Sequence, residues 1–81
     1  MINIIGLGYI GLPTALMFAK SGIEVIGTDY NIELVTKLNS GQLTFEENGL
    51  DELFESAIKN GICFTNMYAR SSFYVVAVPT P

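Results

Sequence analysis

The chain has 81 residues, 49% of them hydrophobic, and a formal net charge of −4. This length allows one small domain. Its four scattered Lys and Arg residues, against eight Asp and Glu residues, argue against a nucleic-acid-binding surface, because phosphate backbones are bound by clustered cations. The single cysteine excludes an intrachain disulfide and favours a reducing compartment, and the absence of histidine removes the commonest metal ligand, so no metal site is expected.

The N-terminus carries no recognisable secretory signal, and no stretch reaches the ~20 apolar residues of a membrane span. Together with the cysteine count, this predicts a soluble, cytoplasmic protein. Neither a membrane nor a nucleic acid is an expected partner.

The first part of the chain alternates between strand and helix patterns. Residues 1–5 form a short apolar run before glycine, which is typical of a buried strand. Residues 10–21 carry apolar side chains at helical spacing, with Pro13 in the first turn, and predict a helix that Gly22 ends. Residues 23–28 predict a second strand.

The second part contains two helix patterns followed by two strand patterns. Asn31 is a typical N-cap for a helix that ends at Gly41, and residues 50–58 repeat apolar side chains at helical spacing. Residues 62–64 predict a brief third strand. Residues 73–78 are nearly continuously apolar, which is typical of a strand buried on both faces.

The order of these elements predicts an α/β fold with a Rossmann-like parallel sheet. Right-handed crossovers give the strand order 3-2-1-4, the N-terminal part of a doubly wound domain. The strand of residues 73–78 then lies at an edge. Because an apolar edge is a template for pairing with another chain, we expect a homo-oligomer that forms through this strand.

A glycine-rich turn, residues 6–11 (GLGYIG), stands between the first strand and the first helix. Gly6 allows the tight turn, Gly8 lets the backbone approach a pyrophosphate, and Gly11 lets the helix pack against the sheet. The N–H groups and positive dipole end of the helix then face the anion. Tyr9 is expected to contribute mainly its backbone N–H.

Asp29 ends the second strand, where dinucleotide-binding folds place an acidic residue that accepts hydrogen bonds from the adenosine ribose. Its charge repels a 2′-phosphate, and Tyr30 rather than an arginine follows it, so NAD is favoured over NADP. The alternative is a glycine turn that serves packing, beside an ordinary surface Asp.

Several other residues are expected to have structural rather than chemical roles. Cys63 stands among apolar neighbours with no histidine to activate it, and is expected to be a buried, inert thiol. Glu46 and Glu47 indicate a solvated loop before a helix rather than a catalytic pair. The Met and Phe side chains are expected in the core. Thr80 either offers a group to the cofactor or merely ends the last strand, and both interpretations stay open.

Four motifs in order resemble the UDP-glucose/GDP-mannose dehydrogenase family over essentially the whole chain. They are the opening GLGYIGLP, Asp29 with LNSG at 38–41, ENGL at 47–50 and VPTP at 78–81. The resemblance implies an enzyme of polysaccharide biosynthesis that oxidises the C6 alcohol of a UDP-sugar to a carboxylate, with two NAD molecules and a catalytic cysteine. It further implies that NAD is bound by Gly6, Gly8, Tyr9, Ile10, Gly11 and Asp29, with Val78, Pro79 and Thr80 near the nicotinamide.

The chain departs from the family pattern in two ways. The family often has Lys or Arg at Leu34, Pro at Asn48 and Asp at Asn66, so NAD affinity is expected to be lower. The family's catalytic cysteine, lysine and asparagine and its sugar-binding domain lie beyond residue 81. Residues 1–81 are therefore expected to be a partial NAD-binding (Rossmann) domain without catalytic residues, inactive by itself.

Two other classes share the glycine turn and the acidic residue. One is a non-catalytic module that senses NAD(H). The other is an FAD-dependent oxidase, in which a glutamate often replaces Asp29. The VPTP ending and the ENGL stretch favour the dehydrogenase.

Overall fold

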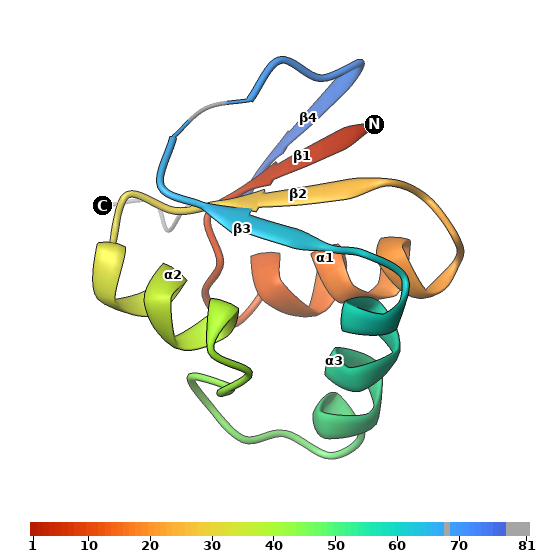
Figure 1. The fold of residues 1–81 in the computed structure, drawn as a ribbon, viewed down its shortest axis with the longest axis vertical. Helices are drawn as coiled ribbons and strands as arrows, with labels where there is room; N and C mark the ends of the chain where they lie inside the picture. The colour runs from red at the N-terminus through yellow and green to blue at the C-terminus, as the bar shows by residue number, and fades with distance from the viewer. Residues whose placement is uncertain (68, 78–81) are drawn as a thin grey trace.

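The computed structural model describes residues 1–67 and 69–77 (Figure 1). Its four strands form one parallel sheet in the order β3-β2-β1-β4, as the sequence predicts. The strands are β1 (Ile2–Ile5), β2 (Val25–Thr28), β3 (Cys63–Thr65) and β4 (Phe73–Val76). The helices are α1 (Gly11–Lys20), α2 (Ile32–Asn39) and α3 (Leu50–Lys59).

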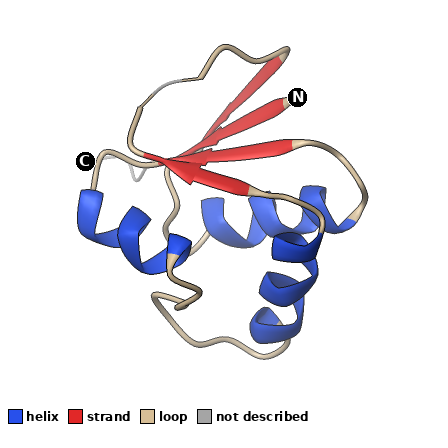
Figure 2. Cartoon of the chain, in the orientation of Figure 1, coloured by secondary structure: helices blue, strands red, loops and turns tan. Residues whose placement is uncertain are grey.

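All three helices cover one side of the sheet, and the connection from β3 to β4 arches over the other side (Figures 1 and 2). A buried polar pair fastens that connection. The side-chain amide of Asn3 in β1 donates to the carbonyl of Ala69 at 3.3 Å, and its oxygen accepts from the Thr28 hydroxyl at 2.8 Å. The connection is thereby tied to the two central strands.

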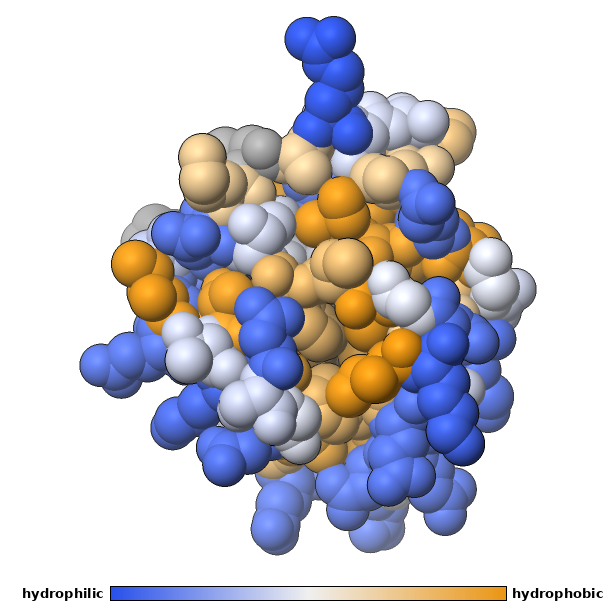
Figure 3. Space-filling view, viewed as in Figure 1, coloured by the Kyte–Doolittle hydropathy of each residue, from blue (hydrophilic) through white to orange (hydrophobic). Residues whose placement is uncertain are grey.

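The hydrophobic core lies between the sheet and the helices. Helix α1 buries Leu12, Ala15, Leu16 and Ala19, whose spacing places them on one face. This face packs against the sheet and α3, and the Asn60 side chain after α3 donates to the Ala19 carbonyl at 2.8 Å. Figure 3 shows apolar side chains in the middle of this view, between α2 and α3, with hydrophilic ones at the sides and lower rim.

Local signals place the helix ends close to the predicted positions. The Asn31 side chain caps α2 by accepting from the Leu34 N–H at 3.3 Å, as expected. Helix α1 ends just before Gly22, whose φ of 89° provides the left-handed turn. Among the described residues, no helix has the length and apolar character needed to cross a bilayer.

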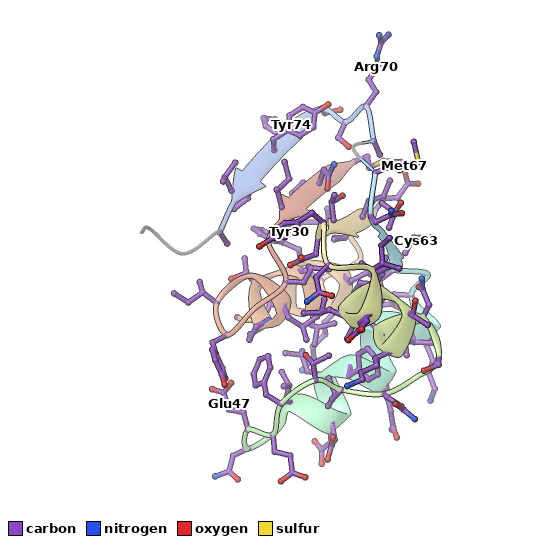
Figure 4. All side chains as sticks on the ribbon, turned by 90° about the vertical axis from the view of Figure 1, so that its left-hand side faces the viewer. Tyr30, Glu47, Cys63, Met67, Arg70 and Tyr74 are labelled. Atoms are coloured by element: carbon purple, nitrogen blue, oxygen red, sulfur yellow. The ribbon has the colours of Figure 1, made fainter. Side chains whose placement is uncertain are left out.

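Strand β4 does not have the burial that its apolar sequence predicts. Phe73 is 67% exposed and Val76 is 65% exposed, and Tyr74 is also exposed. The strand lies at the sheet edge beside β1, and the side chain of Tyr74 lies on the face turned away from the helices (Figure 4). The expectation of burial on both faces is wrong for Phe73–Val76. Tyr74 and Val76 lie on the face that no helix of the described residues covers, whereas Phe73 shares the helix side with Val75 but is exposed at the start of the edge strand.

The expected burial of Cys63 and of the Met and Phe side chains also needs correction. Cys63 is exposed, because it opens the edge strand β3 while its neighbour Phe64 takes the buried side. Of the Phe residues, Phe54 and Phe64 are buried. The exposed members of this group are Met1, Met17, Met67 and Phe73.

Candidate cofactor-binding site

Two adjoining grooves lie at the carboxyl ends of β1, β2 and β4, and both are lined by Gly8 and Ala77. One groove, of about 470 Å³, also includes Gly6, Leu7, Asp29, Tyr30, Asn31 and Leu34. The other, of about 530 Å³, also includes Tyr9, Ile10, Thr14, Val75 and Val76. Strand order reverses between β1 and β4, and open parallel sheets bind ligands at such a switch point.

The glycine turn leaves β1 at the junction of these grooves and is anchored at its start. The Gly6 N–H donates to the Thr28 carbonyl of β2 at 2.8 Å, and Gly6 has a φ of 97°, which favours glycine. Leu7 is fully buried in the core. The turn therefore begins from a fixed point on the sheet.

Gly11 is required by the fold itself. A Cβ atom at this position would overlap the carbonyl oxygen of Gly6 and would lie 3.2 Å from the Cβ of Ala77. The first residue of α1 thus packs directly on the turn and on the end of β4. This is the close helix–sheet contact that the sequence predicts for the third glycine of the motif.

Gly8 is different, because the protein itself leaves room for a side chain there. A Cβ atom would have no heavy atom within 4 Å, and Gly8 is not among the glycines with positive φ. Neither packing nor backbone strain accounts for a glycine at this place. A ligand whose bulky group approaches the Gly8 backbone does account for it, which is what a pyrophosphate requires.

The start of α1 offers unpaired N–H donors at the same place. Ile10 is the N-cap and makes no side-chain capping bond, and the first turn contains no acidic residue. Within residues 1–67 and 69–77, the backbone N–H groups of Gly8, Tyr9 and Ile10 donate to no protein acceptor. Together with the helix dipole, they form a site suited to an anion.

Asp29 lies in the first groove, half-buried, with its carboxylate held by two backbone groups. Oδ2 accepts from the Leu7 N–H and Oδ1 from the Asn31 N–H, each at 2.9 Å. A carboxylate has about four lone-pair positions, so each oxygen keeps capacity for a further donor. A fixed carboxylate at the groove wall suits the two hydroxyls of a ribose.

The remaining side chains around the grooves are mostly apolar. The ring of Tyr9 packs against Phe45, with 4.7 Å between the ring centroids, and Leu34 is half-buried in the lining. Tyr30 lies just beyond the end of β2 and is exposed (Figure 4). Glu46 and Glu47 are exposed on the α2–α3 connection, as expected of a solvated loop.

The structure brings together Gly6, Gly8, Tyr9, Ile10, Gly11 and Asp29 of the predicted site. Val78, Pro79 and Thr80 lie outside the described residues. Sequence reasoning missed Ala77, which lines both grooves and whose N–H donates to Ile5 at 2.7 Å. Its position just after β4, the strand beside the switch point, could have indicated that it lines the site. It also missed Phe45, which lies in a connection without a regular pattern.

Comparison with known proteins assigns the chain to a protein family. The model of the "UDP-glucose/GDP-mannose dehydrogenase family, NAD binding domain" matches residues 1–81, and the cofactor of this family is NAD. The UDP-N-acetyl-D-mannosamine dehydrogenase of Campylobacter jejuni is 43% identical over 81 residues, which cover 99% of this chain and 20% of that relative.

Solved structures give the same result. The UDP-N-acetyl-mannosamine dehydrogenase Cap5O of Staphylococcus aureus has a TM-score of 0.94 at 43% identity, over 99% of this chain and 20% of that one. The GDP-mannose dehydrogenase of Pseudomonas aeruginosa has a TM-score of 0.90 at 30% identity, over 99% and 20%. The chain thus spans about a fifth of the length of the relatives that it matches.

Proposed function

The chain belongs to the UDP-glucose/GDP-mannose dehydrogenase family, and from this premise we propose that it is the NAD-binding part of a nucleotide-sugar 6-dehydrogenase. In this proposal residues 1–81 are a partial Rossmann domain. The catalytic residues and the sugar-binding domain belong to the rest of the enzyme, so the chain binds the cofactor without turning over substrate by itself.

One feature of the site carries the proposal. In the described part of the chain the N–H groups of Gly8, Tyr9 and Ile10 donate to no protein acceptor, and Gly8 beside them leaves open space for a ligand. We assign these groups to the pyrophosphate of NAD, with Gly6 and Gly11 holding the turn in shape. Bound NAD supplies a hydride acceptor. The chain's own residues bind and orient it.

Asp29 is assigned to the adenosine ribose of NAD. Its carboxylate lies in the groove with lone pairs still available, and its charge repels the 2′-phosphate of NADP at short range. Val78, Pro79 and Thr80 are proposed to lie on the nicotinamide side, because they follow the strand that borders the switch point.

For the whole enzyme we propose oxidation of the C6 alcohol of a UDP-sugar to a carboxylate, with UDP-N-acetyl-D-mannosamine as the substrate. The supporting observation is that relatives of this name from several organisms are 41–43% identical to the chain. A role in polysaccharide biosynthesis and a cytoplasmic location are part of the same proposal.

We also propose that the chain self-associates through β4. The strand lies at the sheet edge, and the exposed side chains of Phe73, Tyr74 and Val76 give that edge an apolar character. Edges of this kind pair readily with a second strand. Pairing of β4 with the same strand of a second copy would give a homo-oligomer of this chain.

Calorimetric titration of the chain with NAD and NADP tests the cofactor assignment. We expect NAD to bind more tightly than NADP, and Gly8→Ala to weaken NAD binding by about tenfold or more, because the new methyl group occupies the space of the pyrophosphate. The control is the thermal unfolding of the same variant, which should match that of the wild type. An intact fold that binds no NAD would contradict the proposal.

Substrate and turnover are tested on the enzyme that carries this domain. With UDP-N-acetyl-D-mannosamine and NAD, the whole enzyme should form NADH, whereas residues 1–81 with the same additions should form none. UDP-glucose and GDP-mannose serve as competing substrates. A whole enzyme that prefers either of these would overturn the substrate assignment and leave the cofactor assignment standing.

A further inference from the structure

The aromatic contact between Tyr9 and Phe45 joins two segments that are far apart in the sequence. Tyr9 lies in the middle of the glycine turn, and Phe45 lies in the connection between α2 and α3. Their ring centroids are 4.7 Å apart and their planes are tilted by 53°. Tilted rings at this separation have the geometry of a favourable aromatic pair.

Phe45 is suited to act as a support because it is itself anchored. Its side chain is half-buried and packs against the hydrophobic core, as does its near neighbour Leu43. The connection has no helix or strand to fix its place. The two apolar side chains therefore hold this segment against the core, with the Phe45 ring presented to Tyr9.

The glycine turn is anchored on both sides of the peptide group that joins Tyr9 to Ile10, but not at that peptide group itself. Gly6 and Leu7 are held by Thr28 and Asp29, and Gly11 packs on Gly6. Between them Tyr9 is 79% exposed and Ile10 is 74% exposed, and their N–H groups donate to no acceptor in the described part of the chain. The carbonyls of Gly8 and Ile10 accept from the N–H groups of Leu12 and Thr14 at 3.1 and 3.2 Å. Between Gly8 and Gly11, the peptide group that makes no backbone hydrogen bond within the described residues is therefore the one that joins Tyr9 to Ile10.

We propose that Phe45 is a positioning residue for the pyrophosphate site. By holding the Tyr9 ring, it fixes the backbone between Tyr9 and Ile10, so that the Ile10 N–H is oriented before the anion arrives. This inference rests on the proposed function, since it concerns the same NAD site. Its effect acts through Tyr9, because Phe45 is not among the residues that line either groove.

The prediction is specific to ligands that carry the pyrophosphate. Phe45→Leu keeps an apolar side chain on the core but removes the ring, and should weaken NAD binding about three- to tenfold, the range expected for loss of an aromatic pair. Adenosine, which does not reach the turn, should bind as it does to the wild type. Phe45→Tyr restores a ring and should restore NAD affinity.

Leu43→Ala is the matched control, because Leu43 packs against the core from the same connection and makes no aromatic contact with Tyr9. It should lower stability and leave the ratio of NAD to adenosine affinity unchanged. A Phe45→Leu variant that binds NAD like the wild type overturns the inference. Equal losses for NAD and adenosine also overturn it, since they indicate a general packing defect.

A second readout does not depend on NAD. Amide resonances of the ligand-free chain should show shifts and faster exchange at Tyr9 and Ile10 in Phe45→Leu, and neither change in Phe45→Tyr. Unchanged amides in Phe45→Leu overturn the positioning role. If the wild type binds no NAD, the proposed function fails, and the amide signature still decides whether Phe45 holds the turn.

Discussion

The Oδ2 atom of Asp29 accepts a hydrogen bond from the backbone N–H of Leu7 at 2.9 Å, so the acid that follows β2 fastens the glycine turn that follows β1. Oδ1 of the same carboxylate accepts from the Asn31 N–H before α2. Asp29 therefore has a structural role in the ligand-free chain, besides its proposed contact with the ribose. Loss of this side chain should change both stability and binding.

Asp29→Asn removes the charge of this side chain and keeps its shape, so it should show how much the charge contributes to stability and to NAD binding. An amide has one acceptor oxygen, so its NH₂ group must face one of the two N–H donors, and one hydrogen bond is lost. We expect a loss of about 1–3 kcal/mol in urea unfolding. NAD binding should weaken, and the preference for NAD over NADP should narrow, because the repulsive charge is gone.

Glu24→Gln is the control for Asp29→Asn, because it removes the same charge from an exposed side chain just before β2. It should leave both stability and the NAD to NADP ratio near the wild-type values. Equal unfolding curves for Asp29→Asn and the wild type would show that the two backbone contacts contribute little.

Gly11→Ala should test the packing role of the third glycine in the turn. The added Cβ meets the carbonyl of Gly6, a backbone atom that cannot move without displacing β1 or α1. We expect a destabilisation of more than about 3 kcal/mol, a large fraction of the stability of so small a domain. Thermal unfolding followed by circular dichroism measures it.

Gly8→Ala adds the same methyl group three residues earlier, into open space, and is the matched control for Gly11→Ala. It should unfold at the wild-type temperature. A Gly11→Ala variant as stable as Gly8→Ala would mean that the helix adjusts its packing more easily than the contact with Gly6 implies.

The parts of the fold that could be predicted from sequence are those set by local chemistry. The turn at residues 6–11, the cap at Asn31 and the acid at Asp29 depend on near neighbours, and right-handed crossovers then leave few strand orders. Exposure of β4 and of Cys63 could not be predicted in this way. An apolar strand shows that a face is suited to burial, but a second layer must be present to bury it.

Contacts between segments distant in the sequence could not be predicted either. The Tyr9–Phe45 pair joins the turn to a connection without periodicity, so no spacing rule points to it. The Asn3–Thr28 pair is of the same kind, because an isolated Asn in an apolar strand gives no indication of which side chain satisfies it. Both are found only once the strands and helices are placed in space.

The buried pair of Asn3 and Thr28 allows a double-mutant cycle. Asn3 is fully buried and Thr28 is 3% exposed, so Thr28→Val leaves the Asn3 oxygen without its donor and should destabilise the chain by about 1–3 kcal/mol. Asn3→Leu alone should also destabilise. The double variant should lose less than the sum, because neither apolar side chain leaves the other position with an unpaired group, and the loss of the Asn3–Ala69 bond is counted only once. Additive losses in urea unfolding would contradict the coupling.

Val76→Lys should weaken self-association through β4. The N–H groups of Phe73 and Ala77 donate to carbonyls at either end of β1, so the backbone groups of Tyr74 and Val76 between them are directed to the open edge. An exposed Lys on an edge strand is a common means of blocking strand pairing. Sedimentation velocity over a range of concentrations should show an oligomer for the wild type and a shift toward monomer for Val76→Lys.

Ile32→Lys is the control for Val76→Lys, because Ile32 is also an exposed apolar residue but lies at the start of α2, the helix that packs on β3 at the opposite edge of the sheet. It adds the same charge and should leave the oligomer unchanged. A wild type that stays monomeric at high concentration would contradict self-association through β4. Equal dissociation of the two variants would point to a general effect of charge, since an edge-to-edge contact must respond to Val76 alone.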